Sequence, residues 1–410
     1  MSRPMTIGPG GCVAASAAAL AFALAGCGSN SAGPGVAAAP GAGAQAATAT
    51  PTSAAPTSAA PSSATPATTA APAATTATTP GQTPAKLPAG ASRSAARLLL
   101  IGFGGTRASR PLLRRVAAHE WGGVVLEPGN GSSPQQVAGL VGRLRGAALR
   151  ARHEAPLIGA SQLGGENDAV PVGSAPQAAA ADAPAAQRSA LASAKALSTL
   201  GIRLVLAPVA DTSTPGGPWE GLAFSDDAGD VTAMAGAAVA GWKQGGIAPA
   251  PGHFPGEGAA SGDPVEGPAT VGLSAGELRR RDLQPFLDLA RHAPAIQLSS
   301  ATYVAYDGVT PATLLPAVVT LLRGDLGFGG VIISGDLAAA SLATGRPVAD
   351  LAVAAVKAGC DLLWIPGDAA DQEAARRAIT RALQTGDLPA ARVAEALARV
   401  RLLRARYGVR

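Results

Sequence analysis

Residues 187–207, QRSALASAKALSTLGIRLVLA, contain the unit on which the predicted fold is built. A helical stretch at 187–200 is followed by a short run at 204–207 in which every residue is apolar, so polar and apolar residues do not alternate. Such a run is typical of a strand that is buried on both faces, as strands are in parallel sheets. The unit therefore predicts a helix that packs on a parallel sheet and leads directly into its next strand.

The same unit recurs from residue 93 to the C-terminus. Eight runs rich in Val, Ile and Leu are predicted as strands, at residues 98–101, 123–126, 157–159, 204–207, 247–250, 295–298, 331–334 and 362–365. Helical stretches separate them, and two more follow near 372–383 and 391–407. Eightfold alternation of strand and helix predicts an α/β fold, a single-domain (β/α)8 TIM barrel. A doubly wound open sheet is the alternative, because periodicity alone does not show closure.

Three long loops are expected at the carboxyl ends of these strands, at residues 161–184, 211–229 and 252–272. A barrel carries its active site at that end, and long loops in compact domains are often functional. A ligand site is therefore expected between these loops and residues 334–336.

The N-terminus predicts export. Arg3 precedes an apolar run, 13–25, that is too short to span a bilayer comfortably. The run ends in Leu-Ala-Gly-Cys at 24–27, which resembles a bacterial lipobox. That resemblance implies a signal peptide at 1–26, cleavage before Cys27 and a lipid on its sulfur. Two acyl chains give stable anchoring, so the expected location is the outer face of the cytoplasmic membrane. An ordinary signal peptide with an incidental cysteine is the alternative.

Residues 27–92 are predicted to form a disordered tether. From Gly28 to Gly90 nearly every residue is Ala, Pro, Thr, Ser or Gly, and Lys86 is the one charge. Such a segment cannot bury enough apolar surface to offset its chain entropy. A spacer is the simpler interpretation, and an O-glycosylated stalk is the alternative.

Composition excludes several function classes for the folded part. The net charge is +5, but the basic residues are scattered and aromatic residues make up only 3% of the chain. With few stacking platforms, no nucleic-acid partner is expected. Four scattered histidines and one remaining cysteine, Cys360, give no metal-ligand spacing, so neither metal nor cofactor is expected. Cys360 is predicted to be a small buried hydrophobic residue.

Residues 253–258, His-Phe-Pro-Gly-Glu-Gly, resemble the Lys-His-Phe-Pro-Gly-His-Gly motif of glycoside hydrolase family 3, in its single-domain β-N-acetylglucosaminidase branch. Segments 161–165, 200–211, 273–286 and 327–334 resemble other parts of that family in order and spacing. The match covers most of 93–410. The resemblance implies a retaining glycosidase, in which a carboxylate attacks the anomeric carbon and a second group protonates the leaving oxygen.

The positions that do this chemistry in the family are replaced here. By the resemblance, the nucleophile position is Gly335 and the acid/base position is Val265, while the partner Asp263 remains. Further sugar-contacting or catalytic positions are changed to Gly252, Glu257, Ser161 and Leu222. Glycine cannot bond the anomeric carbon and valine cannot transfer a proton, so the family mechanism loses several orders of magnitude in rate.

Other carboxylates could replace the lost ones. Asp336 follows Gly335, whose backbone freedom could turn Asp336 inward as a nucleophile. An N-cap for the following helix is its structural alternative. Glu257, Glu266 and Asp263 are the candidate proton donors. Retention requires the two carboxyl groups to lie roughly 5–5.5 Å apart.

Three residues are predicted to contact sugar, namely His253, Asp211 and Ser161. A structural hydrogen bond is the alternative for His253, and loop ordering is the alternative for Asp211. Tyr303 and Trp219 could stack on a sugar face, although packing is the common role of lone aromatic residues.

Three functions follow from these residues. The first is a catalytically impaired, lipid-anchored barrel that binds a peptidoglycan-type glycan or a partner. The second is an active exo-β-glycosidase of the β-N-acetylhexosaminidase kind with rewired carboxylates. The third is a structural barrel that binds a protein partner and has no sugar site, which an exposed apolar patch would favour.

Overall fold

A computed structural model describes residues 90–409. The predicted signal peptide, Cys27 and the tether up to residue 89 lie outside these residues. Helix α1 begins at Gly90, three residues before the predicted start of the barrel. Among residues 90–409, no helix is both long enough and apolar enough to cross a bilayer.

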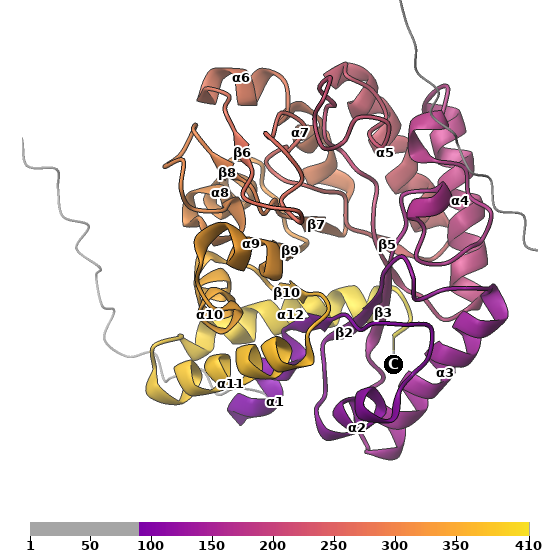
Figure 1. Cartoon of the computed structure of the whole chain (residues 1–410), viewed down its shortest axis with the longest axis vertical. Helices are drawn as coiled ribbons and strands as arrows, with labels where there is room; N and C mark the ends of the chain where they lie inside the picture. Colours follow the sequence, from indigo (N-terminus) through magenta and orange to yellow (C-terminus); the bar gives the residue numbers. More distant parts are fainter. Residues whose placement is uncertain (1–89, 410) are drawn as a thin grey trace, which may run out of the picture. The chain divides into compact units, whose positions relative to one another are not determined.

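Eight parallel strands form one sheet in the order β5-β4-β3-β2-β1-β10-β9-β7. They are β1 Leu99–Ile101, β2 Gly123–Leu126, β3 Leu157–Ser161, β4 Leu204–Leu206, β5 Ala248–Pro249, β7 Ala295–Gln297, β9 Val331–Asp336 and β10 Leu362–Ile365. Strands such as β2, β3 and β10 lie at the centre, with helices around them (Figure 1). All eight predicted strands are confirmed, and their ends shift by at most two residues.

The sheet closes into a barrel between β5 and β7. Gln297 N donates to the Pro251 carbonyl over 3.0 Å, and Phe254 N donates to the Gln297 carbonyl over 2.9 Å. These bonds continue the parallel ladder past the end of β5. The (β/α)8 barrel is therefore confirmed, and the open-sheet alternative is wrong.

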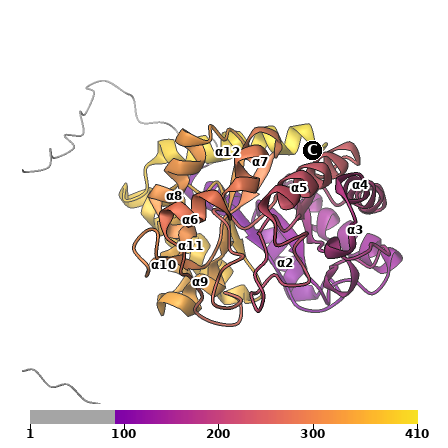
Figure 2. The ribbon, with the colours of Figure 1, turned by 90° about the horizontal axis from the view of Figure 1, so that it is seen from above.

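Helices surround the barrel, with α3, α4 and α5 together on one side and α8, α9 and α10 on the other (Figure 2). The helices are α1 Gly90–Arg97, α2 Arg110–Ala118, α3 Pro134–Arg150, α4 Ala183–Thr199, α5 Ala228–Gln244, α6 Ala275–Arg280, α7 Gln284–His292, α8 Pro316–Thr320, α9 Leu337–Thr344, α10 Val348–Ala358, α11 Ala369–Thr385 and α12 Ala390–Arg406.

Two of the predicted helices are interrupted. The predicted helix at 275–291 breaks between α6 and α7, where Pro285 cannot donate a backbone hydrogen bond. At the break, the Arg281 side chain donates to the carbonyls of Thr212 and Ser213 instead. The stretch at 311–323 divides into a 3-10 turn, the short α8 and a π-helical turn, and Pro316 starts α8. A small parallel pair, β6 Thr270–Val271 with β8 Thr302–Tyr303, was not predicted from the sequence.

The inside of the barrel is packed with apolar side chains. Alternate strand residues such as Leu100, Val125, Val331 and Ile333 form one cluster with Val400, Leu403 and Tyr407. The last three belong to α12 and the C-terminal residues, so this segment covers the amino-terminal end of the barrel. A cavity lined by loop residues lies at the opposite, carboxyl ends of the strands.

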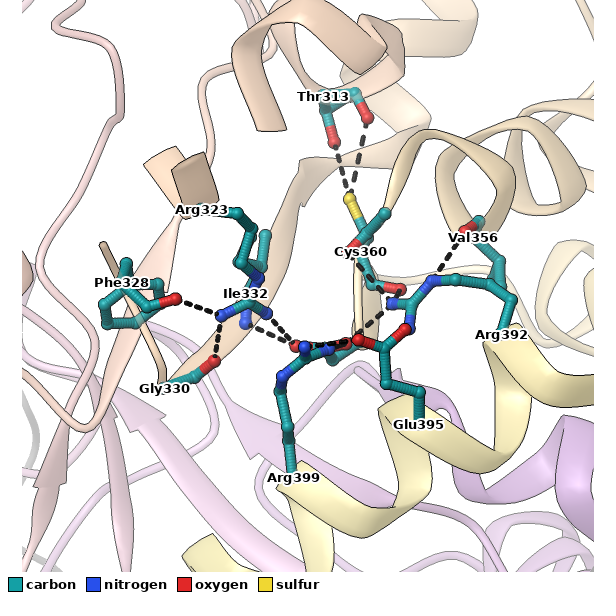
Figure 3. A network of polar contacts seen from close by, with 12 residues as sticks. Thr313, Arg323, Phe328, Gly330, Ile332, Val356, Cys360, Arg392, Glu395 and Arg399 are labelled. Carbon is teal, nitrogen blue, oxygen red and sulfur yellow. Dashed lines mark hydrogen bonds and ion pairs between the residues drawn. The ribbon is translucent and has the colours of Figure 1, made fainter. Parts of the chain in front are cut away.

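A buried ionic network fastens α12 to the barrel (Figure 3). Asp361, which is fully buried before β10, accepts hydrogen bonds from Arg323 at 2.5 Å, Arg392 at 2.6 Å and Arg399 at 3.2 Å. The backbone N–H of Ile332 donates to it over 3.0 Å. The neighbouring Cys360 is also fully buried, as predicted, and burial raises the pKa of its thiol to about 12.

Candidate active site

A cavity of about 850 Å³, part of it open to solvent, lies at the carboxyl ends of the strands. We call it the mouth. Carboxylate, aromatic and small side chains line it, and none of its lining residues is Lys or Arg. Its lining includes Glu127, Ser161, Leu163, Pro208, Trp219, Gly252, His253, Glu257, Asp263, Val265, Ser300, Gly335 and Asp336.

The mouth brings together most of the predicted site residues. Ser161, at the end of β3, and His253, Glu257 and Asp263, in the loop after β5, all line it. Asp211 lies behind His253 and is fully buried. Glu266 lies on an exposed turn and is not part of the wall.

His253 is held by Asp211 from behind. Its Nδ1 lies 2.8 Å from Asp211 Oδ2, and its backbone N–H donates to the same oxygen over 3.1 Å. Burial alone would lower the pKa of His253. The charges of Asp211 and Glu257 and the hydrogen bond to Asp211 outweigh burial and raise the pKa to about 9. His253 is therefore an imidazolium at neutral pH, and Nε2 is the ring nitrogen left for a ligand.

Asp211 also fixes the loop after β5, because the backbone N–H of Glu257 donates to it over 2.6 Å. The Glu257 carboxylate accepts a hydrogen bond from the Ser299 hydroxyl and is almost completely buried. Burial raises the pKa of Glu257, although the nearby His253 charge opposes that rise. His253 therefore makes the structural hydrogen bond that was its alternative role, and Asp211 orders the loop, which was its alternative role. His253 also lines the mouth.

The two aromatic candidates differ. The Trp219 indole stacks on the His253 ring with centroids 4.5 Å apart and planes 18° apart, and it lines the mouth. Tyr303 is fully buried in β8 and donates its hydroxyl to the Gly256 carbonyl over 3.0 Å. A stacking role for Tyr303 is therefore wrong, and its role is packing.

Asp336 reaches the mouth because β9 bulges. Ile333 pairs with Leu362 and Asp336 pairs with Trp364, so three steps along β9 match two along β10. An extra residue reverses the alternation of side chains beyond it. Gly335 and Asp336 consequently both line the mouth.

Asp336 is also the N-cap of α9. Its Oδ1 accepts hydrogen bonds from the backbone N–H of Ala338 at 2.7 Å and of Ala339 at 3.0 Å. Burial raises the pKa of Asp336 although these two donors oppose the rise. One carboxylate oxygen of Asp336 is therefore hydrogen-bonded to the start of α9, and the residue also lines the mouth.

A side chain at position 335 would force the Ser300 side chain to move. A Cβ built on Gly335 would overlap Ser300 Oγ and would come within 3.0 Å of the Leu298 carbonyl oxygen. Val265, which the resemblance places at the acid/base position, is 62% exposed, and its backbone N–H donates to Asp263 Oδ1 over 2.8 Å. Neither position carries a group that can react.

One carboxylate of the mouth was missed in the sequence. Glu127 directly follows β2 and lines the mouth beside Gly102, whose Cβ would come within 2.9 Å of Glu127 Oε2. Burial, followed by the negative charge of Asp336, raises the pKa of Glu127 to about 7. Its position directly after a predicted barrel strand was the sequence signal that could have identified Glu127 as a site residue.

No metal centre is indicated within residues 90–409, where no three His, Cys, Asp or Glu side chains group as ligands. The fold and the mouth together define a TIM barrel with an acidic, aromatic-lined site at the carboxyl ends of its strands. That is the architecture in which carboxylate-based glycosidases are built.

The chain belongs to glycosyl hydrolase family 3, because the model of that family's N-terminal domain matches residues 94–403. A Beta-hexosaminidase of Pseudomonas aeruginosa is 31% identical over 294 residues, which cover 69% of this chain and 86% of that protein. Beta-hexosaminidase LpqI of Mycobacterium tuberculosis is 33% identical over 211 residues, 49% of this chain and 54% of that one.

Solved structures agree with this assignment. A family 3 β-N-acetylglucosaminidase from Paenibacillus sp. superposes with a TM-score of 0.73 at 29% identity, over 78% of this chain and 62% of that one. The match thus spans less than two thirds of that enzyme's length. A β-N-acetylhexosaminidase from Beutenbergia cavernae gives a TM-score of 0.69 at 25% identity, over 79% of this chain and all of that one.

Proposed function

We propose that the mouth binds a glycan of the cell envelope, of the N-acetylhexosamine type, without cleaving it by the family's double displacement. The observation that carries this proposal is position 335, where a nucleophile is absent and a Cβ would overlap Ser300. Val265 removes the proton-transfer group at the second position. The relatives are named as hexosaminidases, which supports a sugar of that class as the ligand.

Two side chains of the mouth suit such a ligand. Trp219 offers an indole beside the mouth, and His253 offers a charged donor that Asp211 holds in place. Amphipathic rings next to fixed hydrogen-bond donors suit ligands with an apolar face and polar edges. The proposal therefore assigns recognition to Trp219 and His253.

Binding is tested by titrating chitobiose into the purified full chain and following heat. Saturable binding is expected, and Trp219→Ala should weaken it about tenfold, which corresponds to about 1.4 kcal/mol. Trp121→Phe is the control, because Trp121 packs under Arg115 outside the mouth and should leave the affinity unchanged. No saturable binding, or equal affinity in Trp219→Ala, would contradict the proposal.

A second candidate is a retaining exo-β-glycosidase with relocated carboxylates. It is favoured by the meeting of Glu127 and Asp336 at the mouth, where the charge of Asp336 raises the pKa of Glu127. In this mechanism Asp336 attacks the anomeric carbon and forms a glycosyl-enzyme, while protonated Glu127 gives its proton to the leaving oxygen. Glu127 then takes a proton from the water that releases the sugar. Sugar release that depends on both residues distinguishes this candidate from pure binding.

We further propose that the chain is exported and lipid-anchored through Cys27 at the outer face of the cytoplasmic membrane. Support comes from the Leu-Ala-Gly-Cys sequence at 24–27 and the uncharged stretch that follows it. Cys27→Ala should abolish metabolic labelling with a fatty acid and release the protein from membranes. Equal labelling of wild type and Cys27→Ala would refute this assignment.

A further inference from the structure

A second cavity adjoins the mouth. It encloses about 690 Å³, part of it open to solvent, and lies between α4, α5 and the loop after β3. Its walls are mostly apolar and small, and they include Leu163, Ala186, Ala190, Pro208, Phe224 and Trp242. We call it the side cavity.

The sequence of α4 creates this space. Residues 185, 186, 189, 190 and 193 are all Ala or Ser, and this spacing places them on one face of the helix. No side chain on that face is long enough to fill the gap. Phe224 and Trp242 supply aromatic surface to the same cavity.

The loop that forms the opposite wall is held in place by its own polar groups. Gln162 bonds both the N–H and the carbonyl of Val170, and Gln177 does the same to Val209. Asp168 accepts hydrogen bonds from Gly164 N and from the Ser174 hydroxyl. Because these side chains are bonded to the protein, what the loop offers the cavity is apolar surface.

Leu163 and Pro208 line both the mouth and the side cavity. The two cavities are therefore adjacent, and the two side chains that they share are apolar. We propose that the side cavity binds a hydrocarbon group carried by the ligand of the mouth, so that the chain recognises a glycoconjugate with an apolar aglycone or acyl chain. This inference rests on the proposed glycan binding and specifies which class of glycan is bound.

The lining fits such a group, because ligand pockets are lined mainly by apolar side chains. Each methylene that leaves water for an apolar site contributes about 0.8 kcal/mol, which is about fourfold in affinity. The affinity of an alkyl glycoside should therefore increase with chain length until the side cavity is filled.

The test uses methyl, butyl, hexyl and octyl N-acetyl-β-glucosaminides below their micelle concentrations, with the full chain carrying Cys27→Ala so that no protein-bound lipid competes. We expect the dissociation constant to fall about fourfold per methylene over the first few carbons. Ser189→Phe should fill the side cavity, leave the methyl glycoside unchanged and abolish the chain-length effect. Ala192→Phe places the same ring on the exposed face of α4 and should behave as wild type.

No dependence on chain length in wild type, or the same dependence in Ser189→Phe, would overturn the inference. If the methyl glycoside fails to bind at all, glycan binding is refuted instead. Hexanol then tests the side cavity alone, through a change in tryptophan fluorescence that Ser189→Phe should abolish. Absence of that change in wild type would also overturn the inference.

Discussion

Glu127→Gln should stabilise the protein, and the gain should grow with pH. The pKa of Glu127 is about 7, against an ordinary value of 4.5. The folded state therefore favours the protonated carboxyl, and ionisation destabilises the fold as pH rises from 4.5 through 7. A difference of about 2.5 pH units corresponds to about 3 kcal/mol above pH 7. Because part of the side chain faces solvent, screening reduces the expected value to about 2 kcal/mol.

Urea unfolding at pH 5, 6, 7 and 8 measures this effect. Glutamine keeps the size of the side chain and cannot ionise, so the variant should exceed wild type by only about 0.5 kcal/mol at pH 5. At pH 8 it should exceed wild type by about 2 kcal/mol. Glu166→Gln removes the same charge from an exposed turn and should change stability little at any pH. A Glu127→Gln difference that is constant from pH 5 to 8, or that falls with pH, would refute the reasoning.

The result would also indicate what Glu127 does. A charge that destabilises the fold at neutral pH is commonly retained at a functional site. Glu127→Gln should therefore lower the affinity for chitobiose while it raises the free energy of unfolding. A variant that is more stable and binds chitobiose as wild type does would assign Glu127 no part in recognition.

Three further predictions concern the buried polar groups and the replaced nucleophile position. Asp361→Ala should lower the free energy of unfolding by about 3–5 kcal/mol, because it leaves three arginines facing a buried gap. His253 should titrate near pH 9 in an NMR experiment, and Asp211→Asn should lower that pKa. Since the pKa of His253 is raised from 6.5, its stabilisation is complete below pH 6.5 and is lost as pH rises through 9. Gly335→Ala should cost about 1–3 kcal/mol in a urea titration, because the added methyl overlaps Ser300.

Each of these predictions has a matched control. Asp387→Ala breaks an exposed pair with Lys357 and should cost at most about 1 kcal/mol, so an equal loss in both aspartate variants would contradict the network. For His253, titration near 6.5 in wild type would contradict the Asp211 pairing. For Gly335, adding Ser300→Gly should recover part of the lost stability, and no recovery would refute the steric explanation.

Much of the barrel could be predicted from the sequence because each strand is a continuous apolar run. The strands at 123–126 and 204–206 are buried on both faces and contain no polar residues, so the apolar run itself marks the strand. The two-residue strands β6 and β8 escaped prediction because a pair so short has no periodicity. The break between α6 and α7 has a local signal in Pro285. The carbonyls that receive the Arg281 side chain belong to a distant loop, so no local pattern indicates that contact.

The candidate site could be predicted only in part. The motif at 253–258 and the ends of β3 and β9 predicted which segments meet at the mouth. The inward turn of Asp336 depends on a bulge against β10, so its orientation is a property of two strands rather than one. Glu127 was overlooked because a single carboxylate after a strand is ambiguous until its neighbours are known.

The measurement that tests the central claim most directly is sugar release by the full chain from a panel of aryl β-glycosides that includes the N-acetylglucosaminide. Asp336→Ala, Glu127→Gln and a heat-inactivated sample run beside it. The account predicts no release above the heat-inactivated sample for any substrate, together with saturable binding of chitobiose. Release by wild type that disappears in Asp336→Ala would contradict it and would identify the chain as a glycosidase whose nucleophile has moved by one residue.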